Sequence, residues 1–175
     1  MIIGHLPAGY LLGRAFSRLR LVADLRARDL VGASMLGSIF PDLDMIYFHL
    51  IDHGQTHHHL YWTHLPTIWI ALSSAILFAG TIASKLRAPP AFWFFMLGVM
   101  SHLVLDSLIG DIYWAIPFSY EPFSMFTVQA RRSPWYFNFI LHWVFVLELA
   151  LAGFAAAVAC GDMRWYRARL HSLHW

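Results

Sequence analysis

The amino-acid sequence predicts an all-α protein, an integral membrane helical bundle with three clear transmembrane helices and two shorter N-terminal membrane helices. Hydrophobic residues make up 59% of the 175 positions and charged residues only 13%, which is too apolar for an ordinary soluble domain. Two long apolar runs match the thickness of a bilayer, and histidines and aspartates recur near the ends of the apolar segments. No linker or repeat divides the chain, so we expect one domain over residues 1–175.

Five apolar segments follow one another along the chain. Residues 65–84 carry no charged side chain and residues 135–160 carry a single acid, so each matches the ~20 residues of a membrane span. A third span is expected at 91–110, directly after a proline-rich turn. The two earlier segments, 2–16 and 30–40, are shorter, and at ~1.5 Å per residue neither crosses ~30 Å of hydrocarbon unaided.

The two N-terminal segments carry small residues four positions apart, Gly9 with Gly13 and Ala33 with Gly37. Small residues let helix backbones approach each other closely in lipid, where van der Waals contact drives helix association. We therefore expect these segments to pack into a compact bundle.

Lysines and arginines divide unequally between the two sides of a path in which five helices alternate in direction. One side receives Arg14, Arg18, Arg20, Arg26, Arg28, Lys85, Arg87, Arg164, Arg167 and Arg169. The other side receives only Arg131 and Arg132. By the positive-inside rule the first side, which includes the C-terminus, is cytoplasmic. The same path places the candidate site residues described below on the opposite, periplasmic face of a multi-pass protein.

The pair His102 and Asp106 is the strongest local indication of a bound metal. Residues four apart lie on one face of a helix, so an imidazole and a carboxylate can reach one ion. Ionisable residues inside an apolar segment are costly to bury and often mark functional sites. The alternative interpretation is that the two side chains bond to each other or to a neighbouring helix.

Asp42 and Asp44 form a second group of candidate ligands, in the sequence Pro-Asp-Leu-Asp. Proline followed by acids is also what the first turn of a helix favours. If the segment is helical, its two carboxylates point apart, so one aspartate would reach a metal while the other caps or orients. Because an aspartate that is not a ligand could accept a proton, both are also candidate catalytic residues.

Histidines are concentrated just before the segment 65–84. His59 and His64 are favoured as metal ligands, whereas His53, His57 and His58 are interpreted as solvated neighbours.

Two isolated histidines complete the set. His5 stands at the start of the first apolar segment, and His142 is a possible additional ligand because it lies as deep in the last expected span as His102 does in its own. Mixed His and Asp sites suit Zn²⁺ and also hold other first-row metals, so we expect a divalent metal, foremost zinc. The candidate ligands are His5, Asp42, Asp44, His59, His64, His102 and Asp106.

The order and spacing of these motifs resemble the YdjM family of bacterial inner-membrane proteins, to which metal-dependent hydrolysis is ascribed. The resemblance rests on His5-x-x-x-Gly9, the run Gly37 to Asp44, His59-x-x-x-Thr63-His64, the run His102 to Ser107, and the run Trp114 to Ser119. It implies a location in the inner (cytoplasmic) membrane and a polar constellation made of the seven candidate ligands. More distantly, the pattern is similar to the zinc-dependent phospholipase C and P1 nuclease group, which implies phosphoester hydrolysis.

The chain departs from the family pattern after His59. The family usually carries His-Arg-Gly before its Thr-His pair, whereas Leu60 and Tyr61 follow His59 here. An arginine at that position would be a natural phosphate clamp. Arg131 and Arg132, on the same expected side, could take that role.

Together these observations predict a membrane-bound metal-dependent hydrolase that acts on a phosphoester or lipid-like substrate through a metal-activated water. The aromatic residues between 113 and 126 could seat an amphiphile beside the bilayer, or they could form an ordinary interfacial belt. Two other classes remain open: a metal-stabilised structural or regulatory membrane protein, and a metal transporter or sensor. Nucleic-acid binding is not expected, because the basic residues form no continuous basic face.

Overall fold

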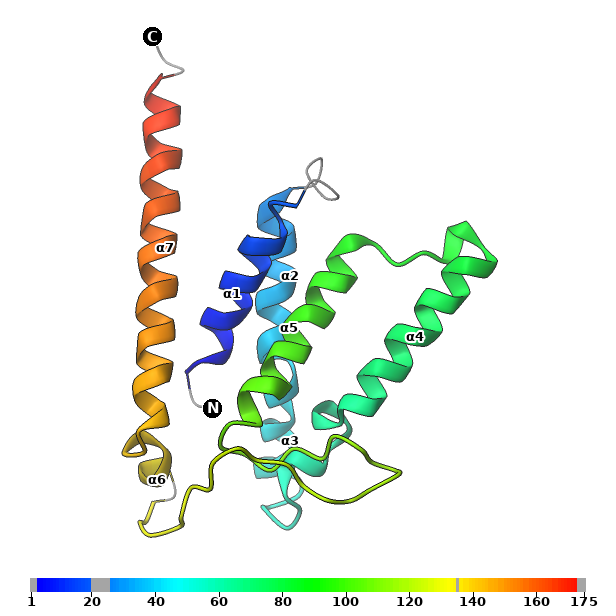
Figure 1. The fold of residues 1–175 in the computed structure, drawn as a ribbon, viewed down its shortest axis with the longest axis vertical. Coiled ribbons are helices and arrows are strands. Elements are labelled where there is room, and N and C mark those ends of the chain that lie inside the picture. The colour runs from blue at the N-terminus through cyan, green and yellow to red at the C-terminus, as the bar shows by residue number, and fades with distance from the viewer. Residues whose placement is uncertain (1–2, 20–25, 135, 173–175) are drawn as a thin grey trace.

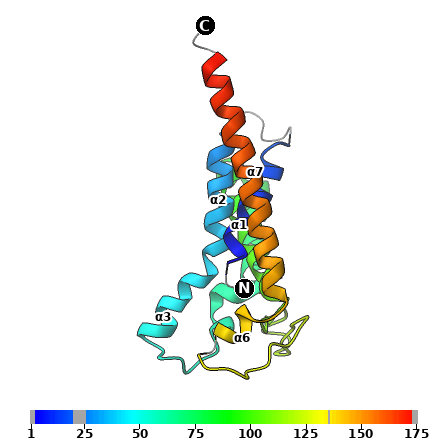
Figure 2. The ribbon, with the colours of Figure 1, turned by 90° about the vertical axis from the view of Figure 1, so that its left-hand side faces the viewer.

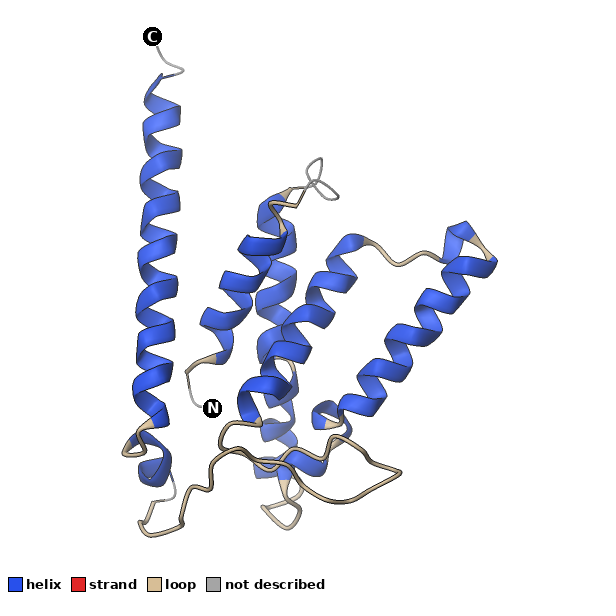
Figure 3. Ribbon diagram, in the orientation of Figure 1, coloured by secondary structure: helices blue, strands red, loops and turns tan. Residues whose placement is uncertain are grey.

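The computed structural model describes residues 3–19, 26–134 and 136–172. This part of the chain is built from helices and loops, with a single isolated bridge between Ile112 and Phe123, so the predicted all-α class is confirmed (Figures 1 and 3). The α-helices are α1 (His5–Phe16), α2 (Ala27–Ile39), α3 (Asp44–Leu50), α4 (Pro66–Ile82), α5 (Pro90–Asp106), α6 (Tyr136–Ile140) and α7 (Val144–Ser172). Short 3-10 turns are η2 (Pro41–Leu43), η3 (His58–Leu60), η4 (Trp62–His64) and η5 (Ser84–Leu86).

The last apolar segment is not one continuous helix, so the expected span over 135–160 is wrong at both ends. The short helix α6 is followed by a turn, and α7 begins only at Val144 and runs to Ser172. In that turn the Val144 N–H lies 3.4 Å from His142 Nδ1 and donates to it. A side-chain bond of this kind competes with the helical ladder. His142 therefore lies in a turn before α7 and not inside a span.

One helix among the described residues is long and apolar enough to cross a membrane, the 21-residue portion Val144–Arg164 of α7. The expectation of three clear spans is thus not confirmed. Helices α4 and α5 are apolar but have 17 residues each. At ~1.5 Å per residue, 17 residues extend over only about 26 Å. The third expected span ends early because α5 stops at Asp106, whose carbonyl accepts the Gly110 N–H in the following turn.

Glycines bring α1 against α2, as the sequence predicts. A Cβ added to Gly9 would lie 2.3 Å from Ser38 Oγ, and one added to Gly13 would lie 2.9 Å from Ser34 Cβ. Both contacts are closer than real Cβ atoms allow, so only glycine permits this separation of the two helices.

The contact between α2 and α5 is closer still. A Cβ on Gly37 would lie 2.0 Å from the Phe95 carbonyl oxygen, and one on Gly98 would lie 2.0 Å from the Ser34 carbonyl oxygen. Each helix therefore presents a glycine to the backbone of the other. Helices α1, α2 and α5 together form the closely packed centre of the molecule (Figure 1).

Helix α7 stands outside this centre and runs beside α1 (Figures 1 and 2). Polar contacts connect them near both ends of α1. Glu148 Oε2 accepts the backbone N–H groups of Ile3 and Gly4, at 2.7 and 3.0 Å, just before α1. Towards the other end of α1, Arg14 forms an ion pair with Asp162. The buried Glu148 carboxyl thereby satisfies donors at the start of α1, where negative groups are favoured.

The long connection from α5 to α6 crosses beneath one end of the bundle (Figure 3). It is attached to the end of α5 by the N–H groups of Met125 and Phe126, which donate to the carbonyls of Ser107 and Leu108 at 2.7 and 2.8 Å. Several of its aromatic residues are open to the surroundings, among them Phe118, which is 90% exposed. The connection therefore closes that end of the bundle from below and presents aromatic side chains outward.

Candidate metal centre

Six chain segments bring their polar residues to one end of the bundle. His5 begins α1, Asp42 lies in η2 and Asp44 begins α3, while His102 and Asp106 lie near the end of α5. The η3 and η4 turns add His59 and His64 to the same end. All of these residues are buried except Asp42, which is half-buried. The structure therefore brings together all seven candidate ligands named from the sequence.

Four of them form the centre of the group: Asp42, His64, His102 and Asp106. Each offers one ligand atom, and these atoms all lie within 4.8 Å of one another. The shortest separations join His102 Nε2 to Asp106 Oδ2, at 2.9 Å, and to His64 Nε2, at 3.3 Å. Asp42 Oδ1 lies 3.6 Å from His102 Nε2 and 3.8 Å from His64 Nε2.

In both central histidines the Nδ1 atom already has a hydrogen-bond partner. His102 Nδ1 lies 2.8 Å from the Ser38 carbonyl oxygen, and His64 Nδ1 lies 2.7 Å from Asp44 Oδ2. Carbonyl and carboxylate oxygens can only accept, so both Nδ1 atoms carry a proton, and each ring in its neutral form presents an Nε2 lone pair to the group. Outer partners of this kind fix the orientation of metal-binding histidines.

Consequently, acceptor atoms face one another at the centre. Two imidazole lone pairs and two carboxylates meet in a buried space, which is unfavourable unless a cation lies among them. A proton on one imidazole forms a hydrogen bond between only two of these four acceptors, whereas a divalent metal can bind all four at once. The donor set of two histidines and two aspartates therefore fits a metal such as zinc.

Asp44 lies behind His64 and not at the centre. Besides His64 Nδ1, its Oδ2 accepts the hydroxyl of Thr63, whose carbonyl in turn accepts the Trp69 indole N–H at 2.8 Å. This chain of bonds runs from α4 through η4 to the start of α3 and orients the His64 ring. Asp42 faces the centre with a side chain that is 40% exposed.

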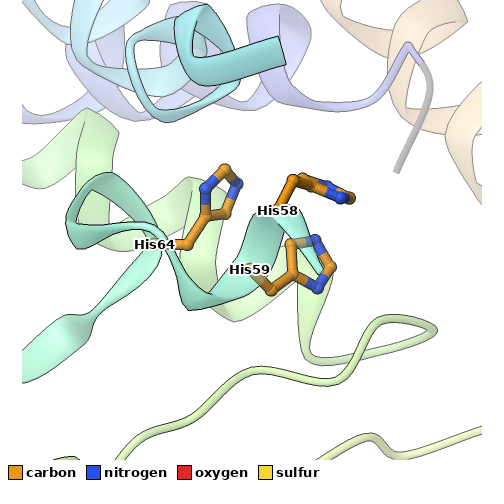
Figure 4. A group of neighbouring side chains, drawn as sticks. All are labelled: His58, His59 and His64. Carbon is orange, nitrogen blue, oxygen red and sulfur yellow. The ribbon is translucent and has the colours of Figure 1, made fainter. Parts of the chain in front are cut away.

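A second group comprises His58, His59 and His64, whose ligand atoms also lie within 4.8 Å of one another. Figure 4 shows the three side chains next to each other along the η3–η4 segment. The sequence favours only His59 and His64 as ligands, and His58 is interpreted from it as a solvated neighbour. In a 3-10 turn the rings of His58 and His59 approach to 4.0 Å between centroids. The density of histidines was the only signal that could have identified His58.

Burial keeps the two η3 histidines neutral. Burial, with a smaller contribution from neighbouring imidazoles, lowers the pKa of His59 to about 2 and that of His58 to about 4. His59 Nδ1 lies 3.2 Å from the Asp111 carbonyl oxygen, which leaves its Nε2 on the side of Asp106 at 3.9 Å. Near neutral pH both residues thus present the unprotonated form that binds metals.

His5 contacts the group from α1. Its ring stacks on that of His102 with centroids 3.8 Å apart, and its Nε2 lies 3.2 Å from Asp106 Oδ1. Its other ring nitrogen, Nδ1, is buried without a hydrogen-bond partner among the described residues. A buried ring nitrogen without a partner is costly, so Nδ1 of His5 also suits a ligand that is not part of the polypeptide.

A cavity of about 590 Å³ borders the group on the side of the long connection. Asp42, His58, His59 and Asp106 line it. Ser124 and residues 126–128 of the connection line it as well. The metal-binding groups are therefore accessible to a small molecule.

His142 lies elsewhere. It lines a neighbouring cavity of about 390 Å³ together with Arg131, Arg132 and Asn138. The two cavities share Thr127 and Val128 along their walls. His142 is thus separate from the described groups of metal-binding side chains, and a basic pocket adjoins the cavity beside them.

Comparison with known proteins gives the family. A profile described as YdjM inner membrane protein matches residues 1–169. The chain belongs to the YdjM family. The resemblance predicted from the motifs is thereby confirmed, and the family description supports an inner-membrane protein. Neither the curated proteins nor the solved structures give a match to this YdjM protein.

Proposed function

We propose that this YdjM protein is a membrane-bound, metal-dependent hydrolase that acts on a phosphoester, and that the substrate is lipid-like. The observation that carries the proposal is the meeting of two imidazole lone pairs with the carboxylates of Asp42 and Asp106 beside an accessible cavity. A purely structural metal site is usually closed by protein ligands, whereas a catalytic site retains an open position.

In this proposal His64, His102 and Asp106 hold the metal, most suitably Zn²⁺, because they are the buried members of the central group. His5 and His59 complete the surrounding set, and Asp44 orients His64. A bound divalent metal lowers the pKa of a coordinated water to about 7 and polarises a phosphoryl oxygen. The half-exposed Asp42 borders the cavity and is the residue best placed to accept a proton there.

The neighbouring basic pocket supports a phosphoester as the substrate. Arg131 and Arg132 line it, and guanidinium groups bind phosphate oxygens with paired hydrogen bonds. The arginine that the family usually places before the Thr-His pair is absent from this chain, and these two residues supply the charge in its place. Aromatic side chains such as Phe118, which is 90% exposed, would hold the apolar part of an amphiphile at the membrane surface.

A multi-pass arrangement in the inner membrane agrees with this location. Helices α4 and α5 have 17 residues each, the lower limit for a span, and α7 is longer. With most arginines and the C-terminus on the cytoplasmic side, the metal centre faces the periplasm.

The metal content of the purified protein is the first test. We expect near-stoichiometric zinc, or another first-row metal, after purification in detergent, and loss of that metal in His102→Ala and Asp106→Ala. His142→Ala serves as the matched control, because this histidine lies outside both groups of metal-binding side chains. Absence of metal after purification with added zinc would contradict the proposal.

Hydrolysis is the second test. Short-chain phospholipids and soluble phosphoesters are supplied to the metal-loaded protein, and the products are quantified. Asp42→Asn should reduce kcat by about 10²–10⁴-fold, the usual contribution of a positioned acid or base. Full metal occupancy without hydrolysis of any phosphoester would assign the centre a structural role instead.

A further inference from the structure

A large cavity lies between α1, α2 and α7. Its volume is about 1220 Å³, above the ~300–1,000 Å³ of sites for drug-sized molecules. We call it the α7 groove. Its walls are largely apolar or small, and include Leu6, Val31, Met35, Ala152, Ala155 and Ala156.

One end of the groove is basic. Arg14 of α1, Arg18 just beyond the end of α1 and Arg28 of α2 line it, and Asp162 of α7 is the acid in the same lining. Asp162 is engaged by Arg14, and the Tyr10 hydroxyl also donates to it at 3.0 Å.

Two of these arginines can reach a ligand. The side chains of Arg18 and Arg28 are 65% and 76% exposed. Arg18 lies only at the limit of ion pairing with Asp162, at 3.9 Å, and Arg28 pairs with the exposed Asp29 at 3.4 Å. Exposed pairs of this kind are weak, so either guanidinium can exchange its partner for a phosphate.

The basic end is opposite the metal centre. His5 begins α1, whereas Arg14 lies in the last turn of the same helix. The groove thus joins an apolar wall, which extends along the helices, to a cationic end at the other face of the bundle. Basic pockets between membrane helices bind the headgroups of anionic phospholipids on the cytoplasmic side.

We propose that the α7 groove binds an anionic phospholipid, with its phosphate at Arg18 and Arg28 and an acyl chain along the alanine-rich face of α7. Such a lipid fills the space that α7 leaves beside α1 and α2, and so holds this helix against the bundle. The proposal rests on the membrane location of the family and is independent of hydrolysis at the metal centre.

Native mass spectrometry of the whole protein in detergent tests this proposal. The probes are phosphatidylglycerol and phosphatidylcholine with identical acyl chains. We expect tighter binding of phosphatidylglycerol, and about a fivefold loss of that affinity in Arg18→Gln, equivalent to the ~1 kcal/mol that one arginine contributes at an anionic surface. The control Lys85→Gln removes a positive charge in η5, outside the groove, and should leave binding unchanged.

A second pair of variants tests the apolar wall. Ala156 lines the groove, whereas its neighbour Ala157 does not, and both are exposed on α7. Ala156→Trp should fill the groove and weaken binding of both lipids at least fivefold, whereas Ala157→Trp should not.

Either of two results would overturn the proposal. In one, both lipids bind equally and Arg18→Gln behaves like Lys85→Gln, which would indicate adsorption to the detergent-covered surface. In the other, the spectra show a dimer that Ala156→Trp abolishes without affecting lipid binding, which would make a second copy of the chain the occupant.

Discussion

The closely packed centre and helix α7 are both apolar, but they are held in different ways. In the centre, Gly37 and Gly98 bring two helix backbones within a distance that no side chain tolerates. On α7, a Cβ added to Gly153 meets nothing within 4 Å, and a cavity of about 1220 Å³ separates much of the helix from its neighbours. The comparison teaches that apolar composition alone does not determine packing. Close backbone approach fixes the metal centre, whereas polar contacts hold α7.

The largest effect is expected from adding a side-chain atom where the backbones of α2 and α5 are in contact. Gly98→Ala places a Cβ 2.0 Å from the Ser34 carbonyl oxygen, so α2 and α5 must separate. We expect a loss of at least about 3 kcal/mol in stability, at the upper end of overpacking costs, measured by thermal unfolding in detergent. Gly153→Ala is the control and should stabilise α7 by up to about 1 kcal/mol. Equal unfolding temperatures of the two variants would refute the contrast between the two regions.

The next largest effect concerns the attachment of α7. Glu148 is 1% exposed and accepts the N–H groups of Ile3 and Gly4. Glu148→Ala leaves these donors without that acceptor, so we expect a loss of about 2–3 kcal/mol in thermal unfolding. Glu148→Gln retains an acceptor oxygen and should lose less. If alanine and glutamine have the same effect, the hydrogen bonds do not hold α7.

A smaller effect is expected behind the metal centre. Asp44→Asn removes the charge that orients His64 without removing a central ligand. Partners of this kind contribute about 10–100-fold to metal affinity, so we expect a weakening in that range by competition with a chelator. Asp29→Asn, at an exposed position at the start of α2, provides the control. A complete loss of metal would instead make Asp44 a direct ligand.

The smallest effect is expected at the second contact of α7. Arg14 and Asp162 have side chains that are 23% and 42% exposed, in contrast to the buried Glu148. Asp162→Asn should therefore cost at most about 1 kcal/mol in the same unfolding measurement. A loss as large as that of Glu148→Ala would show that both ends of α7 are equally important for its attachment.

Much of this protein could be predicted from the sequence. Apolar composition and helix spacing gave the all-α class and the pairing of His102 with Asp106, because the helical period places residues four apart on one face. The motifs also gave the YdjM family, which the family profile confirms. The placement of His5 and Arg14 at opposite ends of α1 likewise follows from their positions in one helix.

The roles of the remaining residues are determined only by the tertiary structure. The roles of Asp42 and Asp44 depend on the η2 turn, which leads directly into α3, and His58 joins its neighbours because η3 is a 3-10 turn. Gly98 packs against the Ser34 carbonyl oxygen, and α7 begins only after His142. Both features depend on contacts that local sequence patterns do not contain. The physical reason is that helical periodicity is a local property, whereas turns and backbone contacts depend on residues far apart in the chain.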